Sequence, residues 1–393
     1  MSEHVSPLDA TFLELEQADE SAHMHIGGVL VFDPPSPSAQ ELSDRLEARL
    51  RTLPRYRQRL SSTHTGGLSW PSWEEEPDFD IARHVHRAAL PSPGGEAELM
   101  EWVADYWSHR LDRRHPLWDV VILEGLADGR WALASLILHD EVVPAPKSSL
   151  NQPIGEARRF AVVRVPLADL KAIKRVLGGT VNDVALAAIS GGLRRMLEQR
   201  GDDLRAPGLR AMVPVNLRQA GERLALGNRI TSLFVHLPVH EPDAAARYAA
   251  AVHEAETLKS GSQAVGGATL ISLAGLAPPV IHSLLAQSLY ATRLFNLTVT
   301  NVPGPQRTLY AGGSRLREIF GLVPLAAHHS VGVAILSYDG GVTFGIVGDR
   351  DTVPDLDVLA AGIESSIDEL RKLAARTRRK ARRRTLVKAS HSS

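Results

Sequence analysis

The sequence predicts an α/β protein made of two lobes, and three observations lead to that prediction. Its 393 residues exceed what a single hydrophobic core usually holds, so two lobes are expected. Short β-branched runs alternate with amphipathic segments, an order typical of mixed α/β folds. A passage rich in proline, serine and asparagine, PAPKSSLNQPIG, separates two regions of regular periodicity near residue 150.

The N-terminal lobe is predicted to span residues 1–145. Its first helix reads SAQELSDRLEARLRTLPRYRQRL, with Leu42, Leu46 and Leu50 on one face and Ser38 placed to cap the start. A second helix reads GEAELMEWVADYWSHRLD. The runs HIGGVLVF, WDVVILEGL and RWALASLIL are short, apolar and β-branched, so they are predicted strands.

Residues 146–156 are predicted to link the lobes, and the C-terminal lobe is predicted to span residues 157–370. Within it RRFAVVRVPLADLKAIKRVLGG reads as strand, turn and helix, and TVNDVALAAISGGLRRMLEQRG reads as a long helix. Four later segments predict strands, the last with a hairpin turn: LRAMVPVNLR, ITSLFVHLPV, LFNLTVTNVPGP and HHSVGVAILSYDGGVTFGIVGD. The segment DLDVLAAGIESSIDELRKLAART predicts a closing helix.

Residues 371–393 form a separate basic tail. From Arg371 to Lys388 it holds ten lysines and arginines and no acidic residue, and without them the formal net charge of −1 becomes about −11. Two readings stay open: a solvated, partly disordered end, or attachment to an anionic membrane or lipid-droplet surface, where each basic residue contributes about 1 kcal/mol. Nucleic acid is not an expected partner, because no aromatic residues for base stacking are interleaved.

Other features bound the location and the chemistry. The chain has no cysteine, so disulfides and thiolate metal sites are excluded, and the acidic N-terminus lacks the features of a signal peptide. A cytoplasmic location is therefore expected.

The apolar window Ala268–Phe295 is broken by Pro278-Pro279, which predicts two helices, either packed in the core or in contact with lipid. The sequence motifs of P-loop NTPases, dinucleotide enzymes, zinc proteases and α/β-hydrolases are absent.

A series of short segments resembles one known family over nearly the whole chain before the tail. In order, they read SPLDATFL, PDFDIARHVHRAALP, HPLWDVVILEGLADGRWAL, LNQPIGEARRFAVVRVPLADLKAI, GGTVNDVALAAISGGLRR, VPVNLR, NLTVTNVPGP and LSYDGGVTFGIVGD. They resemble the bacterial wax ester synthase/diacylglycerol acyltransferase family, within the CoA-dependent acyltransferase superfamily. The resemblance implies an α/β fold like that of chloramphenicol acetyltransferase, with a tunnel between the two lobes.

The family's signature, H-H-x-x-x-D-G at the end of a strand, is incomplete in this sequence. In register, Leu138 takes the place of the first histidine and His139 that of the second, while Val143 and Pro144 stand where the family has aspartate and glycine. Several dozen residues that the family carries after this motif are also missing before SSLNQPIG. Either the protein has a true deletion, or the sequence omits a segment of it. The continuity of the sequence from His139 to Leu150 does not distinguish the two.

The resemblance makes His139 the general base. In the family this histidine takes the proton from an acceptor hydroxyl, which attacks the acyl-CoA thioester directly, and an imidazole with a pKa of about 6.5 suits that role. Asp140 and Glu141 follow it but are not expected to replace the missing aspartate, because side chains next to a strand histidine point elsewhere. The pair His328-His329 lacks the Asp-Gly that should follow, so it is expected to be structural.

Two further motifs are placed near the tunnel by the resemblance. Pro116, Leu117 and Trp118 are expected either to wall the substrate channel with a large rigid indole or to be purely structural. Asn182 and Asp183 are expected to orient a helix near the tunnel or simply to cap it.

The resemblance places Asn301, just before a Pro-Gly-Pro turn, facing the active-site channel, so Asn301 is a candidate hydrogen-bond donor to the oxyanion that develops during the reaction. Such a bond contributes about 3 kcal/mol when it is well aimed. No metal site and no redox cofactor are expected, since acyl-CoA is itself a substrate.

The resemblance implies an O-acyltransferase with two substrates. A fatty acyl group would pass from acyl-CoA to diacylglycerol, giving triacylglycerol, or to a long-chain alcohol, giving a wax ester. The protein would associate peripherally with the inner face of the membrane or with lipid droplets. The alternative is a catalytically impaired member of the family that acts as a lipid-binding or lipid-droplet surface protein. Leu138, Val143 and Pro144, together with the basic tail, favour that alternative.

Overall fold

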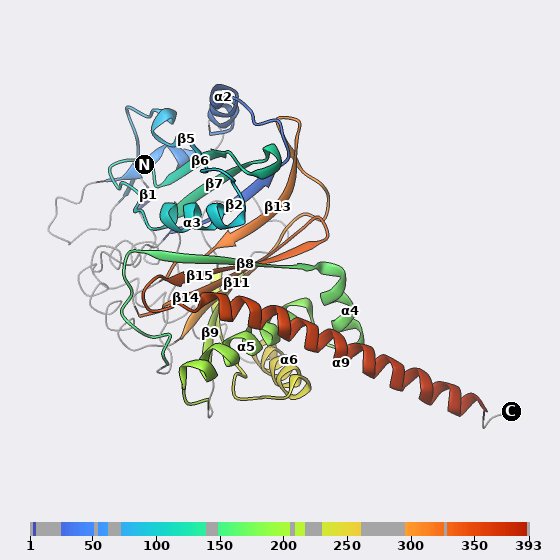
Figure 1. Ribbon diagram of the computed structural model, residues 1–393. Helices are drawn as coiled ribbons and strands as arrows, with labels where there is room; N and C mark the ends of the chain where they lie inside the picture. Colours follow the sequence, from blue (N-terminus) through green and yellow to red (C-terminus); the bar gives the residue numbers. More distant parts are fainter. Residues whose placement is uncertain are drawn as a thin grey trace.

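Two six-stranded sheets organise the chain, in the computed structural model shown in Figure 1. The structure describes residues 3–4, 25–50, 54–61, 72–138, 148–204, 209–216, 230–260, 295–325 and 328–390. A smaller three-stranded sheet has the order β1-β4-β3. Helices pack on the sheets, so the predicted α/β architecture of two lobes is confirmed.

The first sheet has the order β12-β13-β2-β7-β6-β5 and organises the first lobe. The three strands predicted from β-branched runs are β2, β6 and β7, at the centre of this sheet. Its strands are β2 (His25–Phe32), β5 (Val85–Ala89), β6 (Trp118–Glu124), β7 (Trp131–Leu138), β12 (Tyr310–Ala311) and β13 (Ser314–Leu322). The smaller elements are β1 (Glu3–His4), β3 (Gln58–Leu60), β4 (Ser72–Glu75) and the 3-10 turns η1 (Pro54–Arg57), η2 (Ile81–Arg83) and η3 (Ala127–Gly129).

Both predicted helices of this lobe form, but the first is shorter than expected. It is α2 (Ala39–Leu50), and its start is capped as predicted, because the Ser38 hydroxyl accepts a 3.2 Å hydrogen bond from the Glu41 N–H. The prediction that it continues through PRYRQRL is wrong. Pro54 begins a 3-10 turn and β3 follows, because proline lacks an N–H and disfavours helix before it. The second helix, α3 (Glu96–Trp107), buries Leu99, Val103 and Trp107.

The second sheet has the order β10-β9-β11-β14-β15-β8 and organises the second lobe. Its strands are β8 (Arg158–Pro166), β9 (Leu209–Asn216), β10 (Ile230–Leu237), β11 (Leu297–Pro303), β14 (Val331–Tyr338) and β15 (Gly341–Asp349). Its helices are α4 (Leu167–Leu177), α5 (Val181–Arg200), α6 (Ala244–Ser260) and α9 (Leu356–Ser390). The predicted hairpin joins β14 to β15, with Asp339 and Gly340 both at positive φ as a tight two-residue turn requires.

The sheets do not divide at the predicted linker. β12 and β13 lie far beyond residues 146–156 in the chain, yet β13 pairs antiparallel with β2 in the first sheet, from Leu322 opposite Gly27 to Leu316 opposite Phe32. Residues 157–370 are thus not confined to one sheet. Local sequence carries no information on which distant strand becomes a partner, so this crossover could not be read from periodicity.

Helix α5 is the buried centre of the second lobe, and it crosses α9 at very short range. A Cβ placed on Gly362 of α9 would lie 2.7 Å from the Gly192 Cα, and a Cβ on Gly192 would lie 2.7 Å from the Ile363 side chain and 2.9 Å from the Ile363 nitrogen. Only glycine allows the two backbones to approach this closely, since the obstructing atoms include backbone that cannot move aside. The crossing therefore depends on Gly192 and Gly362.

We expect Gly362→Ala to lower the free energy of unfolding by about 1 to 3 kcal/mol through overpacking of this crossing. The effect opposes intrinsic propensity, since alanine in place of glycine favours an isolated helix by about 1 kcal/mol. Urea unfolding followed by circular dichroism measures the change. Ala361→Leu, at the exposed neighbouring position of the same helix, is the control and should unfold close to the parent. Equal stability of Gly362→Ala and the parent would contradict the close crossing.

A buried ion pair lies in the second sheet, next to a contact between the lobes. Arg158 begins β8 and Asp349 ends β15, their side chains are each 1% exposed, and Arg158 Nη1 lies 3.6 Å from Asp349 Oδ2. Asp349 also accepts hydrogen bonds from the N–H groups of Gly155 at 2.8 Å and Thr352 at 2.9 Å. The Arg158 N–H donates to the Ser108 hydroxyl at the end of α3. The pair therefore joins two strands of the second sheet at the point where the Arg158 backbone contacts a helix of the first lobe.

We expect Asp349→Asn to lower the free energy of unfolding by about 3 to 5 kcal/mol, because it leaves the Arg158 charge buried without its counter-ion. Thermal unfolding monitored by tryptophan fluorescence measures the loss. The control is Asp112→Asn, since Asp112 pairs with Arg114 at the surface and the side chains are 44% and 84% exposed. If both variants unfold at the parent temperature, the buried pair does not stabilise the junction.

The basic tail is helical and continuous with the second lobe. α9 runs without a break from Leu356 to Ser390, so the predicted boundary at residue 371 is not a structural one, and the reading of a partly disordered end is wrong for residues up to 390. Alanine, arginine and lysine are strong helix formers, which allows the helix to continue past the core.

Among the described residues no single helix is long and apolar enough to span a membrane. The pair α4 and α5, bent by 99° at the break between them, passes the same test by length and composition only. The apolar window Ala268–Phe295 lies, apart from its last residue, outside the described residues, so its two predicted helices stay a prediction.

Candidate active site

The predicted base follows directly on the end of β7. His139 and the residues up to 147 lie outside the described part of the chain, but Leu138 is described, and its neighbours define where the strand ends. Leu138 pairs with His25 of β2 on one side, and Ile137 pairs with Trp118 of β6 on the other. β7 therefore ends between β2 and β6 in the middle of the first sheet, and His139 is the next residue in the sequence.

Trp118 is a buried part of the wall beside this strand end. It is 6% exposed, and its indole N–H donates a 2.7 Å hydrogen bond to the Tyr56 carbonyl. Leu117 is 7% exposed, and Pro116 is also buried. The indole N–H is thus already occupied by the protein, so Trp118 offers a rigid apolar surface and not a hydrogen bond.

His25 is a buried histidine at this strand end that sequence reasoning missed. Its Nε2 lies 3.3 Å from the Trp107 carbonyl oxygen, and its ring meets the Trp107 ring edge-on with centroids 4.9 Å apart. A histidine at the first position of a strand beside the predicted base was the available signal. Its contacts with α3 make it a support for the end of β7.

His84 stacks on Trp118 from the side of β5. The ring centroids lie 4.5 Å apart, and His84 Nδ1 lies 2.9 Å from the Trp118 carbonyl oxygen. Burial lowers the pKa of His84 below the ordinary value of 6.5, although the hydrogen bond to Trp118 and the charge of Asp119 act in the opposite direction. The neutral imidazole is therefore favoured in the folded protein.

This shift predicts a pH dependence of stability. Because the unfolded chain protonates His84 more readily than the folded protein does, the contribution of neutral His84 is fully present above pH 6.5 and is lost as the pH falls through the lower pKa of the folded state. We expect the urea midpoint to fall between about pH 7 and about pH 5.5, and His84→Phe to flatten that slope. His253→Gln, at an exposed position of α6 in the other lobe, is the control and should keep the slope of the parent. A slope unchanged in His84→Phe would contradict the prediction.

The structure joins two residues that the sequence placed near the tunnel separately. Asn301 of β11 donates a 2.8 Å hydrogen bond from Nδ2 to Oδ1 of Asn182, in the first turn of α5. Both side chains are half-buried. The bond fixes the orientation of the Asn301 amide and leaves its second N–H available to another acceptor.

Asp183 is part of the cap of α5. It is 2% exposed, Oδ2 accepts a 2.7 Å hydrogen bond from the Thr180 N–H, and the Asp183 N–H donates to the Thr180 hydroxyl. Its other carboxylate oxygen has no hydrogen-bond partner among the described residues. Burial and the Asp183 charge raise the pKa of the nearby Tyr248 to about 12. These contacts make Asp183 part of the cap that fixes the start of α5 at Val181. Asn182 is the residue directly before Asp183.

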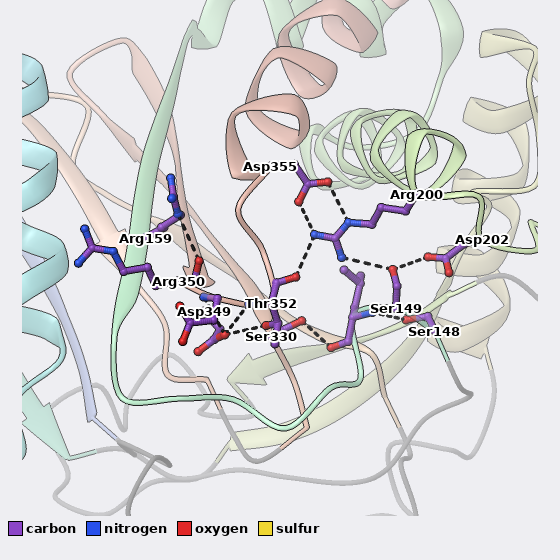
Figure 2. A network of polar contacts seen from close by, with 12 residues as sticks. Ser148, Ser149, Arg159, Arg200, Asp202, Ser330, Asp349, Arg350, Thr352 and Asp355 are labelled. Atoms are coloured by element: carbon purple, nitrogen blue, oxygen red, sulfur yellow. Dashed lines mark hydrogen bonds and ion pairs between the residues drawn. The ribbon is translucent and has the colours of Figure 1, made fainter.

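The described part of the chain begins again at Ser148, where hydrogen bonds attach it to the second lobe. Figure 2 shows the network: the Ser149 hydroxyl donates to the Asp202 carboxylate and accepts a 3.3 Å bond from Arg200, which also pairs with Asp355. The Leu150 carbonyl accepts hydrogen bonds from both the N–H and the hydroxyl of Ser330. This network therefore anchors the chain after residue 147 to the end of α5 and to the segments that flank β14 and β15.

Buried polar side chains extend this anchor. Asn151 accepts a 2.7 Å bond from Asn296 and donates a 2.9 Å bond to the His328 carbonyl. His329 is 2% exposed, stacks on Phe295 with centroids 4.0 Å apart, and places Nε2 3.0 Å from the Phe295 carbonyl oxygen. His329 thus packs in the core of the second lobe, consistent with the expected structural use, while His328 is only half-buried.

No group of three or more histidine, aspartate or glutamate side chains that could hold a metal ion occurs among the described residues.

Comparisons with known proteins identify what this fold and these motifs are similar to. The family model of the wax ester synthase/diacylglycerol acyltransferase catalytic domain matches residues 5–143 and 140–185, and that of the WS/DGAT C-terminal domain matches residues 226–371. The catalytic match breaks into two segments at residues 140–143, directly after His139.

Two mycobacterial proteins are among the relatives. The probable diacylglycerol O-acyltransferase tgs1 of Mycobacterium tuberculosis H37Rv is 33% identical, covering 97% of this chain and 98% of its own length. The probable diacylglycerol O-acyltransferase tgs2 of the same organism is 28% identical and covers 93% and 98%. The tgs1 alignment extends over 456 positions, more than the 393 residues of this chain, so several dozen positions of that relative have no counterpart here.

Solved structures show the same fold. The wax ester synthase/diacylglycerol acyltransferase from Marinobacter aquaeolei VT8 matches with a TM-score of 0.73 at 27% identity, covering 95% of this chain and all of that one. The first condensation domain of the CDA synthetase matches with a TM-score of 0.64 at 16% identity, which concerns the fold alone. These matches confirm the expected two-lobed acyltransferase fold.

Proposed function

This chain belongs to the wax ester synthase/diacylglycerol acyltransferase family, and we propose that it transfers a fatty acyl group from acyl-CoA to diacylglycerol, to a long-chain alcohol, or to both. The observation that carries the proposal is the match to both family domains, across residues 5–185 and 226–371, supported by a relative named for acyl transfer to diacylglycerol that aligns with 97% of the chain. The two products would be triacylglycerol and wax ester.

The proposed reaction is a direct transfer without an acyl-enzyme. An imidazole nitrogen of His139 takes the proton of the acceptor hydroxyl while the hydroxyl oxygen attacks the thioester carbonyl carbon. The C–S bond then breaks, the ester is released, and the CoA thiolate takes the proton from the imidazolium. The place of His139 in the sequence, directly after the last residue of β7 and in register with the second histidine of the family's signature, supports this role.

Asn301 is proposed to stabilise the oxyanion that forms on the thioester carbonyl. Its amide is oriented by the hydrogen bond to Asn182, and one N–H remains for an outside acceptor. A preorganised donor of this kind costs no reorganisation when the charge develops. The apolar face of Trp118, with Pro116 and Leu117, is proposed to bound the channel for the acyl chain or the lipid acceptor.

The reaction is tested by incubating the full chain with palmitoyl-CoA and either diacylglycerol or hexadecanol, and by measuring ester product and free thiol together. We expect product from the parent protein and a loss of at least about 100-fold in kcat for His139→Ala, as for removal of a general base. His86→Ala, which changes a half-exposed histidine of the same sheet, should keep the parent rate. A His139→Ala variant as active as the parent would remove the base from the proposal.

The amide pair generates a separate prediction. Asn301→Ala should lower kcat by about 100-fold to 1,000-fold with little change in KM, because an oxyanion donor acts in the transition state. Asn182→Ala should lower kcat by less, since it removes the orientation of the donor and not the donor itself. If Asn301→Ala changes only the melting temperature, the amide pair is structural.

A second candidate is a family member that binds lipid but does not catalyse acyl transfer. Leu138, Val143 and Pro144 at signature positions favour it, as does the shortfall against the 456-position alignment. The discriminating measurement combines the intact mass of the protein with the assay above. A mass of 42.7 kDa together with lipid binding and no ester formation supports this candidate, whereas ester formation at that mass excludes it.

Both candidates require contact with a lipid phase, because diacylglycerol and long-chain alcohols are insoluble in water. We therefore propose a cytoplasmic protein that associates peripherally with the inner face of the membrane or with lipid droplets. The acidic average charge of the chain before residue 371, about −11, does not favour an anionic surface by itself.

A further inference from the structure

The last turns of α9 extend away from the rest of the protein. Leu370 is 1% exposed and Ala374 is 7% exposed, but every residue from 375 to 380 is exposed. Figure 1 shows the end of the helix projecting beyond α4 and α6, away from both sheets. We call residues 375–390 the C-terminal arm.

The arm carries basic residues that the protein itself does not neutralise. Just before it, Arg371 pairs with Asp169 at 3.2 Å and with Asp368 at 3.4 Å. Within it, the exposed basic residues form no ion pair with any described residue; they are Arg376, Arg378, Arg379 and Lys380. Four further basic residues follow between residues 381 and 390, and the arm has no acidic residue.

This charge pattern acts against the helix that carries it. Arg376 is followed at i+3 by Arg379 and at i+4 by Lys380, and like charges at these spacings destabilise an isolated helix. The negative end of the helix dipole offsets this only within the last turn. An external anionic surface would relieve the repulsion along the whole arm.

The arm is also electrostatically separate from the acidic body. Its residues span about 24 Å at about 1.5 Å per residue, whereas the screening length at physiological ionic strength is about 8 Å. Most of the arm therefore lies outside the field of the body, so its positive charge is available to an anionic partner while the body is repelled. The arm would approach such a surface first.

We propose that the C-terminal arm docks the protein on anionic phospholipid headgroups. The inference rests on the proposed function in one respect: an acyltransferase with a lipid acceptor has to meet a lipid phase. The positive charge of the arm is complementary to any anionic partner. The lack of aromatic residues favours phospholipid over nucleic acid, because residues 371–393 contain no tryptophan, tyrosine or phenylalanine with which bases could stack. A phospholipid surface also accepts a straight helix lying along it without any requirement for sequence.

The test is flotation of the full-length protein with vesicles of phosphatidylcholine containing about 30 mol% phosphatidylglycerol, at about 0.1 M and about 0.5 M NaCl. The variant replaces Arg376, Arg378, Arg379 and Lys380 by glutamine, which keeps the helix-forming character of each position. We expect its partition coefficient to fall by about 600-fold, at roughly fivefold for each of the four charges removed. The parent should float with the anionic vesicles, leave them at high salt, and stay unbound to pure phosphatidylcholine.

The matched control replaces four exposed basic residues outside the arm by glutamine: Arg83, Lys171, Arg175 and Arg350. This variant should float like the parent. If it loses binding as strongly as the arm variant, or if the parent binds pure phosphatidylcholine equally well, the arm is not the docking element. Tighter binding of the arm to a mixed-sequence RNA than to the vesicles at the same salt would also overturn the proposal.

An acyl-transfer assay in detergent separates this proposal from the proposed function. With palmitoyl-CoA and hexadecanol in micelles of a nonionic detergent, the arm variant should keep the parent rate, because no anionic phospholipid is present. Flotation with no activity in any variant would refute the enzyme and leave the docking intact. Equal flotation of the arm variant and the parent would refute the docking whatever the activity.

Discussion

A buried charge has to be paired, and the pair of Arg158 with Asp349 places that constraint at the junction of the two lobes. Both side chains are 1% exposed, so neither charge has water to solvate it, and each depends on the other. Arg158 begins β8 and contacts the end of α3 through Ser108, while Asp349 ends β15. A site that draws residues from both lobes is only as well ordered as this junction.

The chain is anchored on both sides of the incomplete signature. Leu138 is held in register between β2 and β6, and Ser149, Leu150 and Asn151 are held by hydrogen bonds to the second lobe. Neither anchor uses a residue between 139 and 147. A change in length between them therefore alters the site locally and leaves both sheets intact, which fits a family match that breaks at residues 140–143 and continues on both sides.

Local structure was predictable wherever a single short-range rule decides it. The cap at Ser38, the hairpin at Asp339-Gly340 and the strands of alternating or β-branched residues follow from such rules. The predicted extension of the first helix through Pro54 is wrong, because a proline ends the helix even where the spacing of leucines would allow it to continue. Of the two readings left open for the basic tail, partial disorder does not describe residues up to 390, which are helical because alanine, arginine and lysine favour helix.

For the site, the sequence by itself determined which residues to consider. The order of motifs identified the family and put His139, Trp118, Asn182 and Asn301 on the list, since those residues stand in recognisable local patterns. Only the tertiary structure decided how they are related. The bond between Asn182 and Asn301 joins residues 119 positions apart, and β12 and β13 join a sheet whose other four described strands all lie before residue 140. Such contacts depend on which surfaces meet when the lobes pack, and no local pattern of residues encodes that meeting.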